Sequence, residues 1–361
     1  MTTDGTRPVT LRTIADQLGL HVSTVSRALH AKPDESVRAA SSATVARIRQ
    51  LADELGYQPN PHATSLRTRR SNLVGVLVPR LSDIVLATIY EGIEAAAAEH
   101  GLSTFVTNTG DVPETQRTRT AMVIGRRVDG MIFGDAHADA RFLDEVAGRG
   151  VPFALVNRRV GAYPSVTCDD YLGGRMVAEH LLGLGHRDVA VIAGAPYAST
   201  GIDRTAGFTD RYREAGVEIP AHRITHSRFD AAGGHTAAER LLDEAATPSA
   251  IFAVNDFAAI GTIGALRDRG LRAGADVAVV GFNDTPLAAE LPVPLTTVRS
   301  PMHEMGRRGL RLLVRLLEGV DVESERLRPE LVVRASSDPA MYAALGRRLA
   351  GDPVSGSTTG P

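Results

Sequence analysis

The sequence predicts an all-α helix-turn-helix headpiece at the N-terminus, followed by an α/β core of two doubly wound parallel-sheet lobes. Three observations carry this prediction. Residues 1–57 contain short helical patterns and no convincing strand. From residue 73 onward, short apolar runs alternate with longer amphipathic stretches, which is the pattern of βαβ units. The 361 residues are too many for one small domain.

The composition is typical of a soluble globular protein, with 43% apolar and 23% charged residues. The single cysteine, Cys168, excludes an intramolecular disulfide framework and a zinc site built from cysteines alone. The sequence has no run of about 18 apolar residues, and its N-terminus lacks the apolar segment of a secretory signal. We therefore expect a cytoplasmic protein with no membrane partner.

Charge is distributed unevenly along the chain. Residues 1–70 contain ten Lys and Arg against six Asp and Glu, a net charge of +4, whereas the remainder carries a net charge of −6. A basic head on an acidic body predicts that the head meets a polyanion. A basic but merely solvated face is the alternative.

Residues 10–30 predict two short helices that begin at Leu11 and are joined at Gly19. Ala15 is small where the two helices would approach closely, and Gly19 lies where the chain must adopt a positive φ. The apolar residues expected to pack between the helices are Ile14, Ala15, Leu18, Leu20, Val25, Ala28 and Leu29.

The outward face of the second helix would present Val22, Ser23, Ser26 and Arg27. Arg27 can donate two hydrogen bonds to a guanine, and Val22 can touch a thymine methyl group. Ser23 and Thr24 are short enough to reach a base edge or a phosphate. The alternative is a solvated helix pair with one exposed arginine.

This segment resembles the headpiece of the lactose-repressor (LacI/GalR) family of bacterial transcription regulators. Residues 9–30 read VTLRTIADQLGLHVSTVSRALH where the family reads VTLxDVAxxAGVSxxTVSRVLN, and the resemblance continues to about residue 336. It implies that Val22, Ser23 and Arg27 occupy the base-reading positions of a recognition helix. Two features depart from the family. His21 replaces the serine that usually caps this helix, so the cap is weaker or supplied differently, and the loop before the third helix is longer.

Residues 60–67, NPHATSLR, predict a short hinge helix. Asn60 suits the N-cap, and Ala63 and Leu66 lie three apart on one face. A helix this short is marginal alone and should form only when two copies pack together or DNA holds it. The resemblance implies that Leu66 wedges between base pairs in the minor groove; an ordinary linker is the alternative. The expected DNA-binding residues are Thr10, Val22, Ser23, Thr24, Ser26, Arg27, Asn60, Ala63 and Leu66.

Seven apolar runs in the body predict buried parallel strands. They cover residues 73–79, 103–109, 129–134, 151–157, 188–194, 249–255 and 276–282. About four units before residue 160 and three to four after it favour two similar sheets over one wide sheet. Because ligands bind beyond the carboxyl ends of such strands, two facing lobes would form a binding cleft.

We expect no enzymatic activity, no cofactor and no metal site. The body contains no nucleophile elbow, Walker loop, dinucleotide-binding glycine pattern or H-E-x-x-H motif. The eleven histidines are scattered, and Cys168 lies in no nucleophile signature.

The body resembles the periplasmic sugar-binding-protein fold of the family's effector domain. The resemblance implies that Arg204 binds the effector, through vicinal hydroxyls or a carboxylate, and that Phe229 stacks on it. A surface salt bridge and core packing are the respective alternatives. At the end of the first strand the aromatic pair that often lines the family's pocket is missing, and Arg80 and Asp83 appear instead. This would suit a more polar or anionic effector unless Arg80 pairs with Asp83 or serves the dimer. The expected effector-binding residues are Arg80, Asn157, Arg204, Phe229, Asn255, Asp256 and Asn283.

These observations predict a homodimeric repressor that binds a pseudo-palindromic operator on double-stranded DNA, so that it is nucleoid-associated when bound. A small effector, a sugar or sugar derivative, would control it from the cleft. A solute-binding module with the head as an appendage is the rival reading, and an enzyme is third. The predicted domains are the headpiece (1–58), the hinge (59–71), the core (72–337) and a disordered tail (338–361).

Overall fold

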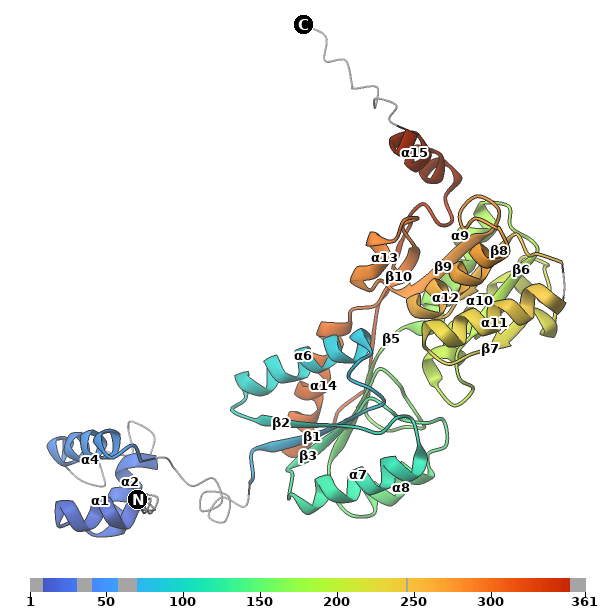
Figure 1. Cartoon of the computed structure of the whole chain (residues 1–361). Coiled ribbons are helices and arrows are strands. Elements are labelled where there is room, and N and C mark those ends of the chain that lie inside the picture. Colours follow the sequence, from blue (N-terminus) through green and yellow to red (C-terminus); the bar gives the residue numbers. More distant parts are fainter. Residues whose placement is uncertain (1–8, 31–40, 58–69, 245, 351–361) are drawn as a thin grey trace, which may run out of the picture. The chain divides into compact units, whose positions relative to one another are not determined.

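The computed structural model describes residues 9–30, 41–57, 70–244 and 246–350 (Figure 1). The chain divides into two compact units, residues 1–71 and residues 72–361. The predicted hinge contacts Asn60, Ala63 and Leu66 lie outside the described residues.

The N-terminal unit, here called the headpiece, packs three helices together: α1 (Leu11–Leu18), α2 (Val22–His30) and α4 (Ser42–Glu54). The Thr10 hydroxyl accepts a hydrogen bond from the Thr13 amide (3.3 Å) and caps α1. Gly19 ends α1 with a φ of 65°, a conformation that costs glycine little.

The headpiece core consists of the predicted inward residues together with the inner face of α4. Ile14, Val25, Ala28 and Ile48 are completely buried, while Leu18, Leu20 and Leu29 are partly buried against them. The predicted helix-turn-helix packing is therefore confirmed.

The larger unit contains two six-stranded sheets, one in each of two lobes. The N-lobe sheet has the order β11-β5-β4-β3-β1-β2, and its strands are β1 (Leu73–Val78), β2 (Ser103–Asn108), β3 (Gly130–Phe133), β4 (Phe153–Val156), β5 (Ser165–Cys168) and β11 (Glu325–Leu327). The C-lobe sheet has the order β12-β10-β9-β8-β6-β7, and its strands are β6 (Val189–Ala193), β7 (Ile224–His226), β8 (Ala250–Ala253), β9 (Ala278–Asn283), β10 (Thr296–Arg299) and β12 (Glu330–Val332). All pairings are parallel except β10 with β12.

Helices cover both faces of each sheet, so every central strand is buried, as the continuous apolar runs predict. In the N-lobe, α6 and α14 lie on one face and α7 and α8 on the other; in the C-lobe, α9 and α10 lie opposite α11 and α12. Their bounds are α6 (Ile84–Glu99), α7 (Pro113–Gly125), α8 (Arg141–Ala147), α9 (Asp170–Gly183), α10 (Ser199–Glu214), α11 (Ala231–Glu244), α12 (Asp256–Asp268) and α14 (Met302–Leu317). The short helices η1 (Ala221–Arg223) and α13 (Pro286–Glu290) complete the C-lobe.

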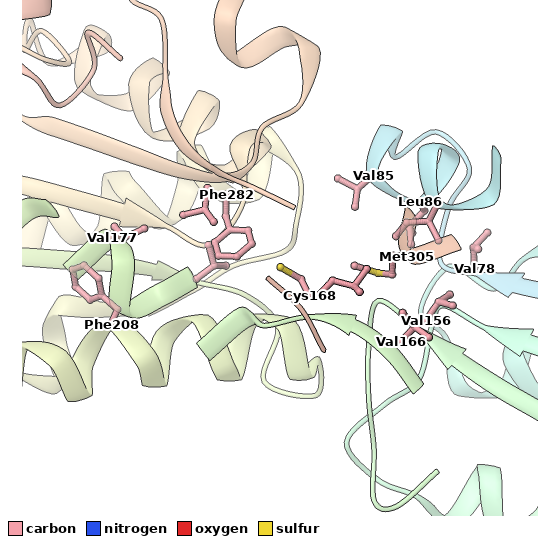
Figure 2. Close-up of a cluster of buried hydrophobic side chains, with 14 of the residues drawn as sticks. Val78, Val85, Leu86, Val156, Val166, Cys168, Val177, Phe208, Phe282 and Met305 are labelled. Atoms are coloured by element: carbon pink, nitrogen blue, oxygen red, sulfur yellow. The ribbon is translucent and has the colours of Figure 1, made fainter. Parts of the chain in front are cut away.

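The chain crosses between the lobes three times: after β5, after β10 and between β11 and β12. An apolar cluster with members from both lobes surrounds these crossings. Figure 2 shows Cys168, at the end of β5, in the middle of this cluster, with Phe282 on one side and Met305 on the other. The lobes are therefore joined by three backbone connections wrapped in apolar side chains, an arrangement suited to bending.

The expectation of disorder from residue 338 onward is wrong for residues 339–350, which form helix α15 (Pro339–Ala350). Asp338 accepts hydrogen bonds from the amides of Ala340 (2.8 Å) and Met341 (2.9 Å) and so satisfies the first turn. The glycine-rich composition that suggested disorder belongs to the last eleven residues, which lie outside the described ones.

Candidate functional sites

The outward face of α2 carries the predicted base-reading side chains. Val22, Ser23 and Arg27 are exposed, and Thr24 and Ser26 are half-buried. Arg27 donates from Nε to the Ser23 carbonyl (3.2 Å), which leaves the two terminal nitrogens of its guanidinium for an outside partner. The outward face of α2 therefore carries short side chains and one guanidinium, and these residue types can reach base edges in a major groove.

The cap of α2 comes from the histidine that replaces the family's serine. The His21 ring accepts a hydrogen bond at Nδ1 from the Ser23 amide (3.3 Å), and Nδ1 also lies 2.8 Å from the Ser23 hydroxyl. An imidazole nitrogen thus takes the place of the usual oxygen acceptor at the second amide of the helix.

A cavity of about 260 Å³ opens between the two lobes of the core, beyond the carboxyl ends of their strands. Six of the seven predicted effector contacts line it: Arg80, Asn157, Arg204, Phe229, Asn255 and Asn283. The fold therefore brings these six side chains, which come from distant parts of the chain, to one cleft; that they bind an effector stays a prediction.

Asp256 is the exception, because its carboxylate turns away from the cleft. It is completely buried and accepts hydrogen bonds from the Thr285 amide (2.6 Å) and the Thr297 hydroxyl (2.5 Å). Burial raises the pKa of Asp256 to about 6, against these hydrogen bonds, which lower it. Asp256 joins the start of α12 to the N-cap residue of α13 and to strand β10, and it does not line the cleft.

Arg204, on α10, joins the wall of the cleft to the interior of the C-lobe. It donates from Nε to Asp170 (2.7 Å) and from Nη1 to the Val254 carbonyl (2.7 Å), and it stacks on the Phe282 ring at 3.7 Å from the ring centre. Burial raises the pKa of Asp170 to about 6, although Arg204 opposes the shift. The third nitrogen, Nη2, makes no hydrogen bond to the described residues and is available to a ligand. Arg204 thus forms a salt bridge with Asp170, as the alternative reading of this arginine expected, but the pair is buried and does not lie on the surface.

Three asparagines at strand ends have different tasks. Asn157 and Asn283 adopt positive φ values of 66° and 115°, which asparagine tolerates better than most residues. The Asn283 side-chain oxygen is buried and has no hydrogen-bond partner in the described part of the chain. The side-chain amide of Asn255 is instead hydrogen-bonded within the protein: it donates to the Phe229 carbonyl (2.9 Å) and accepts from the Ala258 amide (2.9 Å).

Sequence reasoning missed the ion pair that forms the N-lobe wall of the cleft. Arg158, with 4% of its surface exposed, donates two hydrogen bonds to Asp111 (2.7 and 2.9 Å). The guanidinium also lies near the Tyr197 and Phe229 rings, 5.7 and 5.8 Å from their centres. Asp111, Arg158 and Tyr197 all follow strands of the sheets, so the strand-end rule that applies to Asn255 and Asn283 could have found them.

Several contacts tie the lobes together across the cleft. Arg159 of the N-lobe pairs with Asp203 of α10 (2.8 Å), and His137 stacks on Tyr197 with ring centres 4.3 Å apart. Arg80 lies 3.9 Å from Asp230 of the C-lobe, so the alternative that it pairs with Asp83 is wrong. Asp83 instead accepts from the Val85 amide (3.0 Å) and caps α6.

Among the described residues, no helix is long and apolar enough to cross a membrane. The same residues contain no cluster of three or more His, Cys, Asp or Glu side chains that could hold a metal ion.

A helix-turn-helix headpiece followed by a two-lobed core with a polar cleft defines a class of protein, the DNA-binding regulators that carry a sensory core. Comparison with known proteins narrows this class. Residues 10–60 match the profile of the bacterial regulatory proteins of the lacI family, and residues 178–337 match the periplasmic binding protein-like domain. The HTH-type transcriptional regulator DegA of Bacillus subtilis is 33% identical over 337 residues, covering 91% of this chain and 98% of DegA.

Solved structures agree with this result. The lac repressor dimer bound to operator and the anti-inducer ONPF superposes with a TM-score of 0.82 at 28% identity, covering 92% of this chain and 99% of that one. The complex of the regulator CelR with cellobiose gives a TM-score of 0.69 at 30% identity, covering 92% and 100%. The chain belongs to the lacI family and is a DNA-binding transcriptional regulator. The predicted fold class is confirmed.

Proposed function

We propose that this regulator is a homodimeric repressor whose affinity for a pseudo-palindromic operator is controlled by a neutral carbohydrate bound in the cleft. The observation that carries the effector part is the Asn283 side-chain oxygen, which is buried at the cleft without a partner among the described residues. Buried polar atoms are normally hydrogen-bonded. A hydroxyl group of a ligand would satisfy this oxygen.

The charges around the cleft favour a neutral ligand over an anionic one. Arg158 is neutralised by Asp111 and Arg204 by Asp170, both at 2.7 Å. The remaining two arginines, Arg80 and Arg228, both lie near Asp230 (3.9 and 3.6 Å), and Asp83 supplies a fourth carboxyl group. Four arginines thus face four aspartates. A phosphate or sugar acid would enter a cleft that already holds four carboxyl groups, whereas hydroxyl groups can share their hydrogen bonds.

Two relatives support the finer assignments. The lac repressor neighbour is a dimer on its operator, and the CelR neighbour holds cellobiose. A two-fold dimer matches two half-sites of a pseudo-palindrome. On this proposal the protein works on the chromosome, in the cytoplasm.

The effector is tested by thermal melting of the full-length protein against a panel of neutral sugars, sugar acids and sugar phosphates. A ligand at a hundred times its dissociation constant stabilises the folded state by about 2.7 kcal/mol. Arg204→Lys keeps a cation beside Asp170 but removes the planar fork, so the shift should shrink sharply.

Arg334→Lys is the matched control, because Arg334 also pairs with an aspartate, the half-buried Asp284 (2.7 Å), and donates to the Leu295 carbonyl (2.8 Å), yet does not line the cleft. This variant should keep the full shift. A hit that stabilises Arg204→Lys as much as the unchanged protein contradicts binding in the cleft.

The operator is tested by selecting duplexes from a random pool and measuring binding with and without the hit sugar. An inverted repeat bound by two chains is expected, and Arg27→Ala should cost about 1–3 kcal/mol at one base position of each half-site. Selection of a single half-site bound by one chain would remove the dimer from the proposal. In a reporter strain, the protein should lower expression from a promoter that overlaps the selected site.

A further inference from the structure

The cap of α2 has consequences for how its neighbour reads DNA. His21 is the N-cap residue, since its carbonyl accepts from the Thr24 amide (2.9 Å) and the Val25 amide (3.3 Å). Its ring reaches over the first turn, with Nδ1 3.3 Å from the Ser23 amide nitrogen and 2.8 Å from the Ser23 hydroxyl oxygen. Ser23 is exposed on the outward face of the helix.

The backbone hydrogen bond determines where the imidazole proton is. An amide N–H can only donate, so Nδ1 must be the unprotonated nitrogen and the proton sits on Nε2. The Ser23 hydroxyl also faces Nδ1 at hydrogen-bond distance. Because Nδ1 has no proton to give, the hydroxyl must be the donor in that contact as well.

A hydroxyl group has one proton and two acceptor lone pairs. With its proton directed to His21, the Ser23 oxygen presents only lone pairs to its surroundings. An unconstrained serine can turn to donate or to accept and therefore fits every base.

We propose that His21 is a positioning residue that makes Ser23 a fixed hydrogen-bond acceptor, so that Ser23 selects a base with an exocyclic amine in the major groove. The bases with such a donor there are adenine, at N6, and cytosine, at N4; guanine and thymine offer acceptors instead. The inference rests on the proposed role of α2 in base reading. His21 would thus be a specificity determinant at a position where the family usually has a serine, which has no ring to orient residue 23.

The test uses full-length protein and the duplex that it selects from a random pool. Ser23→Ala first identifies the base pair that Ser23 contacts, as the position at which the selected preference disappears. Binding is then measured to duplexes with each of the four base pairs there. The unchanged protein should prefer adenine or cytosine on the contacted strand by about fivefold to tenfold, the effect of one well-placed hydrogen bond.

Two substitutions of His21 separate orientation from capping. His21→Ser restores an oxygen cap without a fixed acceptor for the Ser23 hydroxyl, so overall affinity should be retained while the preference falls below about twofold. His21→Asn places an amide oxygen where Nδ1 lies, which can accept from both the amide and the hydroxyl, so the preference should be kept. A merely structural histidine would not show this difference between two helix-capping replacements.

The inference is overturned if the contacted base is guanine or thymine, or if His21→Ser keeps the full preference. Failure of the proposed function looks different. In that case Ser23→Ala and Arg27→Ala would both leave the selected sequence and its affinity unchanged.

Discussion

Buried ion pairs set the positions of individual side chains around the cleft. Asp111 and Arg158 are the clearest case, because both are largely removed from water and the two terminal nitrogens of Arg158 each donate a hydrogen bond to the Asp111 carboxylate. Burial by itself would raise the pKa of Asp111, but hydrogen bonds from His137 and Arg158 and the Arg158 charge outweigh it and hold the pKa well below its ordinary range. The pair is therefore ionised at neutral pH.

This shift predicts a specific loss of stability in acid. In the unfolded chain Asp111 titrates near its ordinary pKa of about 4, whereas the fold lowers that pKa, so its contribution is present above that pH and lost as the pH falls below it. Asp111→Asn removes the contribution. Urea unfolding should show the unchanged protein losing stability more steeply than Asp111→Asn between about pH 5 and pH 3. Parallel profiles for the two proteins would contradict the assignment.

Arg204, the arginine proposed to bind the effector, is fixed in position by other protein groups. Arg204 uses Asp170, the Val254 carbonyl and the Phe282 ring before any effector arrives. A guanidinium fixed in this way loses little conformational entropy when it binds. The cost is that removing Arg204 entirely leaves Asp170 as an unpaired buried charge, which destabilises proteins by about 3–5 kcal/mol.

At the scale of elements, the position of Arg204 depends on how closely α10 approaches α9. Gly174 of α9 faces the Arg204 carbonyl, and Gly207 of α10 faces the Tyr171 carbonyl, at distances that leave no room for a Cβ atom. The two backbones are therefore in direct contact, and the glycines allow it.

Gly207→Ala should force α10 away from α9 and cost about 1–3 kcal/mol or more, as overpacking does. Effector affinity should fall with it, because Arg204 moves with the helix. Gly183→Ala is the control on α9, since nothing lies within 4 Å of its added Cβ. Chemical denaturation of the two variants measures the difference. Equal stability of both would show that the helices can separate freely.

Elements differ in how well the sequence predicts them. The seven predicted strands are all present, and six of them are continuous apolar runs that are buried as expected. The expectation of burial is wrong for β2, which lies at the edge of its sheet and is mostly half-buried or exposed. The remaining strands, β5, β7, β10, β11 and β12, have only three or four residues each and include polar ones. Runs that short carry no periodicity, so only pairing with neighbouring strands identifies them.

For the whole molecule, the connections between the lobes offer a reporter of cleft motion. Cys168 lies in the apolar cluster at the crossings with 3% of its surface exposed, and burial raises the pKa of its thiol to about 12. Thiol reagents should therefore react slowly at pH 8 with the folded protein and stoichiometrically in urea. If the effector draws the lobes together, it should slow the reaction further; acceleration would indicate that binding opens this region.

The two proposed sites should respond differently to salt. DNA affinity should fall steeply between about 50 and 200 mM salt, because phosphate contacts release counterions. Effector affinity, measured by calorimetry over the same range, should change little, because a neutral ligand enters a charge-balanced cleft. Strong salt dependence of effector binding would favour an anionic effector instead.

The sequence by itself determined the helices of the headpiece, the buried central strands and six of the seven predicted residues at the cleft. The helices and strands follow from local rules, namely the period of apolar residues and the capping residues. Asn255 and Asn283 follow from the location of ligand-facing side chains after parallel strands, whereas Asn157, Arg204 and Phe229 follow from the resemblance to the family. Only the tertiary structure decided that the chain crosses between the lobes three times, that Arg158 pairs with Asp111 and Arg204 with Asp170, and that Asp256 turns inward. The partners in these pairs are separated by 34 residues or more. Which of two neighbouring polar side chains faces the cleft depends on the packing around both, and local sequence patterns carry no record of that packing.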